Sequence, residues 1–587
     1  MVYLLLQGLQ LIVAATATTA SKHTYCKLTQ SCWPPKEIWA DLNTTLGGSL
    51  ILVTPVAEPC YTDPTGTQCA NIVNNYENPY FTTGTPGSRE YLNFESCGTE
   101  QCQIDLLING TLGTCSLGRL SPYAVNVTKS SHIQLAINFA RMYNIKIVVE
   151  NTGHDLLGRS SAPDSLLIWT HSLKAISYSP KFRIGISATP AFTLGAGVQA
   201  FESYTFADSV NMSITGGNCP TVGIAGGWFA GGGHGPFGPL YGLGAEQVLQ
   251  VKIVTPDGIL RTLNSNSVGI ENDLFWAVRG GGGGTWGVVT EVTFQAYPKQ
   301  PFVLVSFSNN IVNPSDNSTK ALLTEFVETL ASIQSTFAGL KAFGEYYFSP
   351  FSIAGIYYVP TEDTVLVENT FAPILKFFSK WENQLTGNST TIVAFPSFNS
   401  LRIAIPDNQI YGFNGVLSSR FIPKNLFANS STISTMAKAL VDGYYINVPD
   451  GSPQSQIPAI ASIPVTINAG GPLDHTSTTD TASHPAWKDI YWLVTYATGW
   501  TKNLADYAEL FSTDVSAAAN PLRELTPGFG TYFNEADISE PNWQESFFGS
   551  NYPKLLEIKK EIDPHGQFSV WKGVGWVSGA DSSDYCY

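Results

Sequence analysis

The most regular hydrophobic pattern lies between residues 130 and 155. Ser130 or Ser131 is expected to cap a helix, and the apolar run 145–149 to form the strand that follows it. The apolar face of this helix consists of Ile133, Ala136, Ile137 and Ala140. The loop 151–155 comes directly after the strand, where side chains are presented rather than packed.

Similar patterns recur along the chain. Residues 247–263 predict a hairpin that turns at 256–258, and residues 288–294 predict another strand. Amphipathic helices are expected over 320–337 and 551–560. Helices and strands thus mix throughout, which predicts an α+β fold with a nucleotide-type domain at 119–300 and a second α+β domain at 301–520 that covers a pocket. Residues 521–587 are expected to form a C-terminal segment of helix and loop.

The first 20 residues predict a secretory signal peptide. An apolar run spans 4–17, and small residues continue to Ala20, which suggests cleavage near Ala17 or Ala20. A buried N-terminal helix is the alternative. No later run reaches the about 18 apolar residues that a membrane span needs, so none is expected.

Residues 21–118 form a cysteine-rich N-terminal extension. This segment is rich in Pro, Gly, Asn and Thr and has little periodicity, which predicts a loop-rich cap held by disulfides. It contains Cys26, Cys32, Cys60, Cys69, Cys97, Cys102 and Cys115. No Cys-x-x-Cys pair supports a zinc site, and no metal is expected. The chain has nine cysteines, so at least one is free, modified or shared with another chain. If that one is Cys219, the other eight can form four bridges, and Cys586 must then pair with the N-terminal region.

Composition narrows the class of protein. Hydrophobic residues make up 43% of the 587 residues and charged residues only 13%, which favours a large buried core over disorder. The formal net charge is -15, and no basic run occurs, which excludes a nucleic-acid-binding role. The seven Asn-X-Ser/Thr sequons, which predict N-glycans, are at Asn43, Asn109, Asn126, Asn211, Asn317, Asn388 and Asn429.

Glycines concentrate in two segments. Residues 216–244 contain twelve glycines and residues 280–287 contain six, a density typical of backbone that turns tightly or lies against a phosphorylated cofactor. Residues 233–238 match G-x-G-x-x-G, but no strand precedes them, and Pro236 and Pro239 remove donors, which argues against a Rossmann site. No P-loop or α/β-hydrolase motif occurs.

Two side chains near these segments could carry chemistry. His154 follows a predicted strand, but a histidine there can equally hydrogen-bond to nearby backbone. Cys219 lies inside the first glycine segment, far from the other cysteines, and could be an inert buried thiol.

Five ordered motifs resemble those of the berberine-bridge-enzyme-like oxidases of the vanillyl-alcohol-oxidase superfamily. Residues 149–161, followed by 168–171, resemble the first flavin-binding loop of that family. Residues 216–234 resemble the second, and 273–289 the third. Tyr532-Phe-Asn-Glu535 is similar to the family's Tyr-x-Asn motif, and 543–568 to its C-terminal element. The resemblance covers 119–300 and 520–578 well, the middle weakly and the cysteine-rich start hardly at all.

The resemblance implies a two-lobed, PCMH-type FAD-binding domain with a substrate domain over the flavin. It also implies FAD bound covalently twice, through His154 and Cys219, which gives Cys219 a role outside the disulfides. The other implied cofactor-binding residues are Asn151, Thr152, Gly153, Asp155, Gly158, Arg159, Ser160, Gly216, Gly217, Val222, Gly223, Gly226, Gly227, Gly231, Gly232, His234, Gly287, Val288, Val289 and Tyr552.

For catalysis, the resemblance points to Tyr532 as the base that takes a substrate proton while hydride passes to FAD. Because the pKa of a tyrosine is about 10, this role requires a nearby cation or hydrogen-bond donor. The alternative is a Tyr532 that only packs on the ring, with Asn534 and Glu535 as the polar groups and Glu535 as the base.

The expected function is that of a secreted FAD-dependent oxidase. Val222, three residues after Cys219, is a small side chain that the family associates with oxygen access, so oxygen is the expected acceptor and hydrogen peroxide the product. The aromatic, poorly charged second domain favours a small neutral or aromatic substrate, such as an alcohol or a specialised metabolite, with oxidative cyclisation as one form of the reaction. The alternatives are a carbohydrate oxidase and a non-catalytic secreted flavin-binding protein.

Overall fold

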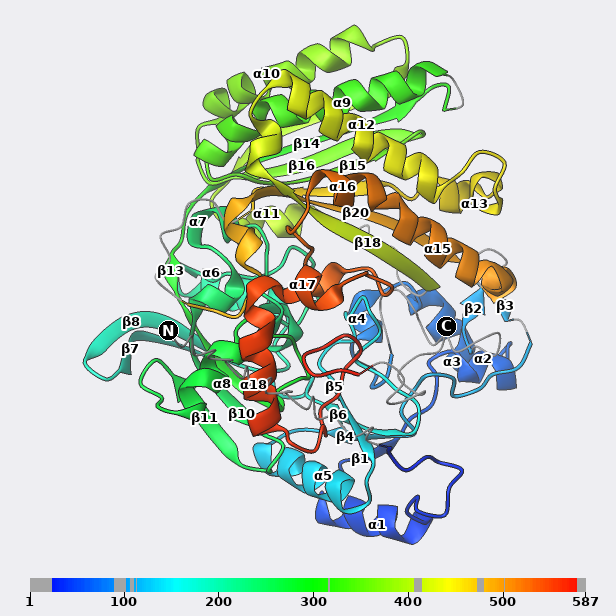
Figure 1. Ribbon diagram of the computed structural model, residues 1–587, viewed down its shortest axis with the longest axis vertical. Helices are drawn as coiled ribbons and strands as arrows, with labels where there is room; N and C mark the ends of the chain where they lie inside the picture. The colour runs from blue at the N-terminus through cyan, green and yellow to red at the C-terminus, as the bar shows by residue number, and fades with distance from the viewer. Residues whose placement is uncertain are drawn as a thin grey trace, which may run out of the picture.

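The computed structural model describes residues 24–88, 102–105, 110–111, 113–314, 317–405, 414–471, 480–500 and 502–577. Two lobes make up this part of the chain (Figure 1). The first lobe contains a four-stranded and a five-stranded sheet together with the C-terminal helices, and the second contains a seven-stranded sheet covered by helices. The predicted signal peptide, Cys97, Asn109 and Cys586 lie outside the described residues.

The four-stranded sheet has the order β1-β4-β6-β5. Its strands are β1 (Leu50–Leu52), β4 (Tyr123–Asn126), β5 (Lys146–Glu150) and β6 (Ser165–Trp169). Strands β4 and β5 run parallel to β6, and β1 pairs antiparallel with β4. The predicted helix before β5 is α5 (Ser130–Met142), whose four apolar residues are buried as expected. The predicted serine cap is wrong, because Lys129 occupies the N-cap without a side-chain hydrogen bond.

The five-stranded sheet is antiparallel and has the order β11-β10-β12-β8-β7. Its strands are β7 (Ile176–Ile184), β8 (Ser187–Gly195), β10 (Val248–Val254), β11 (Leu260–Asn264) and β12 (Val288–Gln295). Strands β10 and β11 form the predicted hairpin, and β12 the strand expected after the second glycine segment. Each glycine segment therefore leads into a strand of this sheet, the first into β10 and the second into β12.

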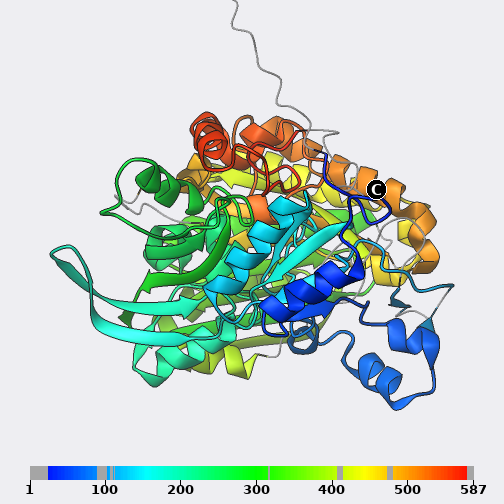
Figure 2. The same cartoon turned by 90° about the horizontal axis from the view of Figure 1, so that it is seen from below.

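The N-terminal extension is more regular than a loop-rich cap. It contains β1 and the helices α1 (Lys36–Thr45), α2 (Glu58–Thr62), α3 (Thr67–Asn75) and α4 (Pro79–Thr82). Trp39 and Leu42 of α1 pack into one hydrophobic cluster with the apolar face of α5, and Figure 2 shows the two helices side by side. The disulfides seen are Cys26–Cys32, Cys60–Cys69 and Cys102–Cys115.

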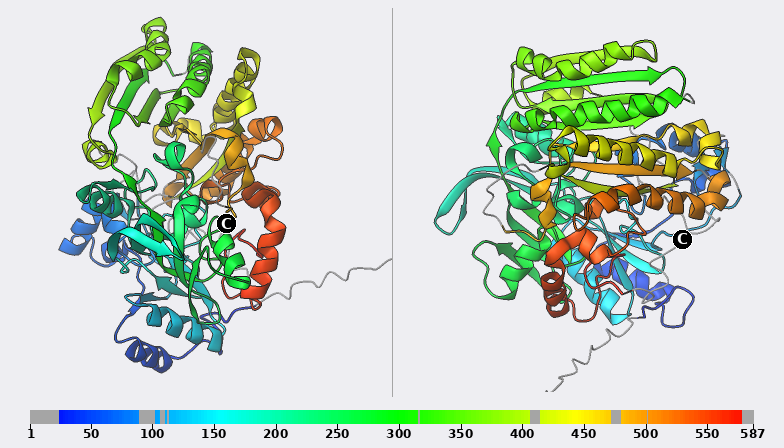
Figure 3. Two further views of the ribbon diagram at one scale, coloured as in Figure 1. Left: turned by 90° about the vertical axis from the view of Figure 1, so that its left-hand side faces the viewer. Right: turned by 45° about the horizontal axis from the view of Figure 1, so that its top comes forward.

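The second lobe is built on the antiparallel sheet β17-β14-β16-β15-β19-β20-β18. Its strands are β14 (Phe302–Ile311), β15 (Phe343–Ser349), β16 (Ser352–Val359), β17 (Leu385–Phe395), β18 (Asn414–Pro423), β19 (Val465–Ala469) and β20 (Ile490–Trp500). Its main helices are α9 (Asn317–Gly339), which includes the predicted helix, α10 (Thr364–Lys380), α12 (Ser430–Asn447) and α15 (Ala508–Ala518). These helices form the outer layer of the molecule (Figure 3).

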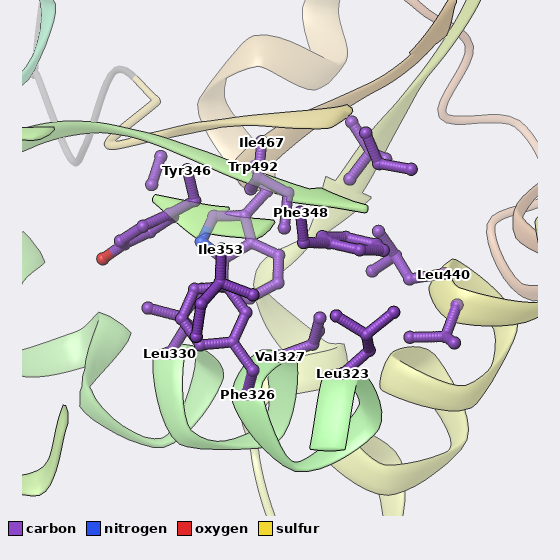
Figure 4. Packing of buried hydrophobic residues seen from close by; sticks show 14 of the residues in the cluster. Leu323, Phe326, Val327, Leu330, Tyr346, Phe348, Ile353, Leu440, Ile467 and Trp492 are labelled. Carbon is purple, nitrogen blue, oxygen red and sulfur yellow. The ribbon is translucent and has the colours of Figure 1, made fainter. Parts of the chain in front are cut away.

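Side chains on this sheet alternate between two environments. Tyr346 and Phe348 of β15 pack with Phe326 of α9 and Trp492 of β20 in the core under the helices (Figure 4). Phe343, on the opposite face of the same strand, packs with residues of the first lobe. Because strand side chains alternate, residues 345 and 347 also face the first lobe.

The C-terminal segment returns to the first lobe through α17 (Trp543–Phe548) and α18 (Tyr552–Ile562), which contacts α8 (Ile270–Val278). The buried ammonium group of Lys559 donates hydrogen bonds to the carbonyl oxygens of Thr285 and Phe568, at 2.6 and 2.8 Å. It also pairs with Asp563 at 2.8 Å. The hydrogen bond to Thr285 ties α18 to the end of the second glycine segment, and Asp563 supplies the counter-charge that the buried Lys559 ammonium requires.

The remaining elements are short. They are α6 (Ala200–Ser209), α7 (Gly238–Tyr241), α11 (Phe398–Ala404), α13 (Pro453–Gln456), α14 (Pro458–Ala461), α16 (Asn520–Leu525), β2 (Ile104–Asp105), β3 (Gly110–Thr111), β9 (Met212–Ser213) and β13 (Tyr297–Pro298). Among the helices of the described ranges, none combines the length and apolar character required to cross a membrane.

We expect Asp563→Asn to lower the free energy of unfolding by about 3 to 5 kcal/mol, because it leaves the Lys559 ammonium buried without a counter-charge. Thermal or denaturant unfolding would measure the change. The matched control is Glu291→Gln, which removes the partly exposed pair with Lys252 and should cost less than about 1 kcal/mol. Equal effects of the two variants would contradict the anchoring role of the buried pair.

Candidate functional site

A cavity of about 610 Å³ is lined by residues of both lobes. The first lobe contributes the loop after β5 and the two glycine segments. The second lobe contributes strands β15, β18, β19 and β20, and the C-terminal segment contributes residues 532–535. The site thus collects the motifs that the sequence separates by almost 400 residues.

His154 and Cys219 meet at one hydroxyl group. The Nε2 atom of His154 lies 2.7 Å from Oγ1 of Thr221, and Sγ of Cys219 lies 3.7 Å from the same atom. Gly153 has φ of 84°, a left-handed conformation that glycine adopts without strain, and this turn presents His154 to the cavity. Among the described cysteines, Cys219 alone is outside a disulfide.

Asn534 of the C-terminal segment forms hydrogen bonds with both the loop after β5 and the first glycine segment. Its Nδ2 donates to the carbonyl oxygen of Gly227 at 3.0 Å and to the hydroxyl of Tyr532 at 2.9 Å. Its Oδ1 accepts from Arg159 at 3.5 Å, and Arg159 in turn forms an ion pair with Asp155. The guanidinium of Arg159 also stacks over Phe533 at 3.9 Å.

Two glycines of the first glycine segment lie too close to neighbouring atoms to carry a side chain. A Cβ atom on Gly235 would lie 2.2 Å from the carbonyl oxygen of Gly216. A Cβ atom on Gly226 would lie 2.4 Å from the side chain of Asn151. The glycines therefore let the first loop and the first glycine segment pack together beneath the cavity.

Several buried polar atoms along the cavity have no hydrogen-bond partner among the described residues. Leaving such an atom unsatisfied costs about 1 to 3 kcal/mol, so a row of them indicates a large polar ligand. The atoms are Asn151 Oδ1, Arg159 Nη1, Ser160 Oγ, Trp286 Nε1, Thr495 Oγ1 and Thr498 Oγ1.

Three ionisable side chains form a group at the junction of the lobes. His234 Nε2 lies 2.8 Å from Glu535 Oε1. Burial alone would lower the pKa of His234, but the carboxylates of Glu535 and Glu345 raise it above its ordinary value. Burial also raises the pKa of Glu345, although hydrogen bonding from Tyr347 and the charge of His234 oppose this.

Tyr532 lines the cavity but is held in its protonated form. Burial, with the charge of Glu535, raises the pKa of Tyr532 far above its ordinary value. The donor and the cation that a phenolate requires are present as Asn534 and Arg159, and both lower the pKa, but burial outweighs them.

Most of the candidate residues from the sequence come together here. The candidates that line the cavity are Asn151, Thr152, Gly153, His154, Asp155, Arg159, Ser160, Gly217, Cys219, Val222, Gly223, Gly226, Gly227, His234, Gly287, Val289, Tyr532, Asn534 and Glu535. The candidates outside this lining are Gly158, Gly216, Gly231, Gly232, Val288 and Tyr552. Of these, Tyr552 packs against Trp543 and Phe548.

The structure adds residues that the sequence analysis did not select. They are Asn218, Thr221, Trp286, Glu345, Tyr347, Thr466, Asn468, Thr495 and Thr498. One sequence signal could have identified the residues of β15. Glu345 and Tyr347 are polar and occupy alternate positions of an otherwise aromatic run, which indicates a strand face directed toward a polar site.

Comparisons with known proteins identify the family of the chain. The family model of the FAD binding domain matches residues 122–264, and that of berberine and berberine-like proteins matches residues 531–575. An uncharacterized FAD-linked oxidoreductase of Arthroderma benhamiae is 32% identical over 97% of this chain and 96% of its own. The chain belongs to the berberine-bridge-enzyme-like family of FAD-linked oxidoreductases.

Two further comparisons support the family. The VAO-type flavoprotein oxidase VAO615 of Thermothelomyces thermophilus is 32% identical over 96% of each chain. The crystal structure of the VAO-type flavoprotein MtVAO615 from Myceliophthora thermophila C1 superposes with a TM-score of 0.81 at 28% identity, covering 95% of this chain and 98% of that one. The expected α+β fold, with an FAD-binding domain and a disulfide-containing N-terminal region, is confirmed.

The cavity residues fit FAD. The cofactor of this berberine-bridge-like protein requires bare backbone and polar atoms for its diphosphate and its ring, and the glycine segments and the unsatisfied atoms of Ser160, Arg159 and Trp286 supply both. FAD supplies an acceptor for a hydride equivalent.

We expect Gly235→Ala to reduce the FAD content of the purified protein and to lower its Tm, because the new Cβ would push the Gly216 carbonyl and the following Cys219 segment away. The ratio of flavin to protein absorbance would measure retention. Gly238→Ala is the matched control, since its Cβ would meet no described atom within 4 Å. Normal FAD content in both variants would show that the close approach at Gly235 is not required.

Proposed function

We propose that this protein is an oxidase that removes hydride from an alcohol or related C–H group of a small neutral or aromatic molecule, with oxygen as acceptor and hydrogen peroxide as product. The observation that carries this proposal is the convergence of His154 and Cys219 on Thr221, beside one cavity that the second lobe lines with the carboxylate of Glu345 and otherwise with uncharged side chains.

We infer that FAD is attached covalently to both His154 and Cys219. The two side chains come from different segments, yet both contact the same buried hydroxyl of Thr221. One planar ring system lying against Thr221 could be reached from both. Attachment at two points raises the tendency of a flavin to accept hydride, which suits unactivated alcohols.

The second lobe supports a neutral substrate. Thr466 and Asn468 of β19 and Thr495 and Thr498 of β20 line the cavity. Their side chains are polar but uncharged, which suits a neutral substrate better than a charged one.

The C-terminal motif, residues 532–535, places three polar side chains at the cavity: Tyr532, Asn534 and Glu535. We assign Tyr532 the role of a hydrogen-bond donor rather than a phenolate base, because burial keeps its hydroxyl protonated. Asn534 fixes that hydroxyl at 2.9 Å. Although burial opposes it, Glu535 raises the pKa of His234 and so favours its charged form.

Oxygen is the proposed acceptor for two reasons. Val222, the small side chain associated with oxygen access, lines the cavity. The relative from Thermothelomyces thermophilus is named a flavoprotein oxidase.

We also propose that the protein is exported and glycosylated. The three disulfides of the N-terminal region favour an oxidising compartment. Asn211 and Asn429 are exposed and accessible for N-glycans, whereas Oδ1 of Asn126 is buried.

We expect acid-denatured protein to stay yellow and to carry the additional mass of one FAD, with peptide mapping that places the linkages on His154 and Cys219. Cys219→Ala should retain FAD through His154 alone, and His154→Ala should retain it through Cys219 alone. Each variant should have a lower flavin reduction potential than wild type. Colourless denatured wild-type protein would contradict covalent attachment.

The protein is mixed anaerobically with each of benzyl alcohol, 4-hydroxybenzyl alcohol and cellobiose, and we expect at least one of the two benzyl alcohols to bleach the flavin. Mixing the reduced protein with air should then restore the colour within seconds. Bleaching by cellobiose alone would favour the carbohydrate oxidase. Bleaching by no donor would favour a non-catalytic protein, and reoxidation that takes minutes would contradict the oxidase.

A further inference from the structure

Glu345 is a carboxylate on the substrate side of the cavity. It lies on β15, where the alternation of side chains points it away from the helices and toward the first lobe, and it is only 8% exposed. It lines the same cavity as His154, Cys219 and Tyr532. A buried carboxylate is costly unless it is held by donors or has a function.

Two donors hold Glu345 through one of its oxygens. The hydroxyl of Tyr347 donates to Oε2 at 2.7 Å, and Nδ2 of Asn218 donates to the same atom at 2.9 Å. Among the described residues, none donates a hydrogen bond to Oε1. Asn218 directly precedes Cys219, so this contact ties the carboxylate of the second lobe to the segment proposed to hold the flavin.

The charged and titratable groups around Glu345 come from three elements. Tyr347 belongs to the same strand, His234 to the first glycine segment, and Glu535 to the C-terminal segment, next to Tyr532. His234 and Glu535 already pair with each other, so neither serves as the direct ion-pair partner of Glu345. The carboxylate is therefore oriented by neutral donors while its second oxygen stays available.

We propose that Glu345 is the proton acceptor of the oxidation, taking the substrate O–H or N–H proton on Oε1. This inference rests on the proposed oxidase function. In the step, the substrate C–H bond breaks and its electron pair leaves as hydride to FAD. The O–H bond breaks and its proton passes to Oε1, and the carbonyl double bond forms. Oxygen then takes up the two electrons and two protons to give hydrogen peroxide, which returns Glu345 to its ionised form.

The neighbouring groups fit this assignment. Tyr532 is protonated, so it can donate to the substrate oxygen but cannot accept its proton. Burial raises the pKa of Glu345, which makes its carboxylate a stronger base than that of an exposed glutamate. Tyr347 acts as a positioning residue, because its hydrogen bond stabilises the ionised carboxylate.

The test compares Glu345→Gln, Tyr347→Phe and the control Glu325→Gln, a partly exposed glutamate of α9 that pairs with Lys380. Reduction of the flavin is followed anaerobically over a range of pH. The donor is the compound of the panel that reduces wild type fastest. We expect Glu345→Gln to slow reduction on the order of a hundredfold or more and to lose the rise of rate with pH. Tyr347→Phe should retain reduction but move that rise to higher pH, and Glu325→Gln should match wild type.

A second readout needs no substrate. Burial raises the pKa of Glu345 in the folded protein above its unfolded-state pKa of about 4.3. Between these two pKa values, the wild-type protein therefore loses stability as the pH rises. The Tm of Glu345→Gln relative to wild type should therefore increase with pH over that window, and Glu325→Gln should show no such trend.

The possible outcomes separate the two proposals. If wild type is reduced and Glu345→Gln is reduced equally fast with the same pH profile, the assignment of Glu345 is overturned while the oxidase stands. If no donor reduces wild type, both are overturned. If Glu345→Gln does not fold, an unchanged pH profile of Tyr347→Phe would still overturn the assignment.

Discussion

The amide of Asn534 is the contact on which the geometry of the site depends. It donates to Gly227 and Tyr532 and accepts from Arg159, so three distant segments meet at one side chain. Each of these hydrogen bonds satisfies a polar group of a different part of the chain, and together they set how the segments lie against one another. The C-terminal segment thus contacts both the loop that carries His154 and the glycine segment that carries Cys219.

Much of the first lobe could be predicted because its determinants are local. The helix and strand before His154 follow from apolar periodicity over 20 residues, and the hairpin 247–263 from its turn residues. The motifs around His154, Cys219 and Tyr532 also lie on short stretches with a recognisable order. The cap of α5 was wrong because Ser130 lies one residue inside the helix. The extension was expected to be loop-rich, although Trp39, Leu42 and Leu46 have the spacing of a buried helix face.

The substrate side of the site could not be predicted in the same way. Glu345 reaches the cavity because β15 pairs with β16 and β19 in the centre of a seven-stranded sheet, and its pairing with β19 joins residues more than 100 positions apart. Its contact with Asn218 also depends on how the two lobes face each other. Thr221 was missed for a different reason: a single hydroxyl within a glycine segment has no pattern, and its role appears only when two side chains are seen to converge on it.

Along the strands of the seven-stranded sheet, neighbouring residues have different roles, because one packs in the core and the next faces the cavity. In β19, Val465 and Ile467 belong to the core under the helices, whereas Thr466 and Asn468 line the cavity. Evolution can therefore exchange every second residue of these strands to accept a new substrate, while the intervening residues preserve the scaffold. Diversification of chemistry and retention of architecture proceed on opposite sides of the same ribbon.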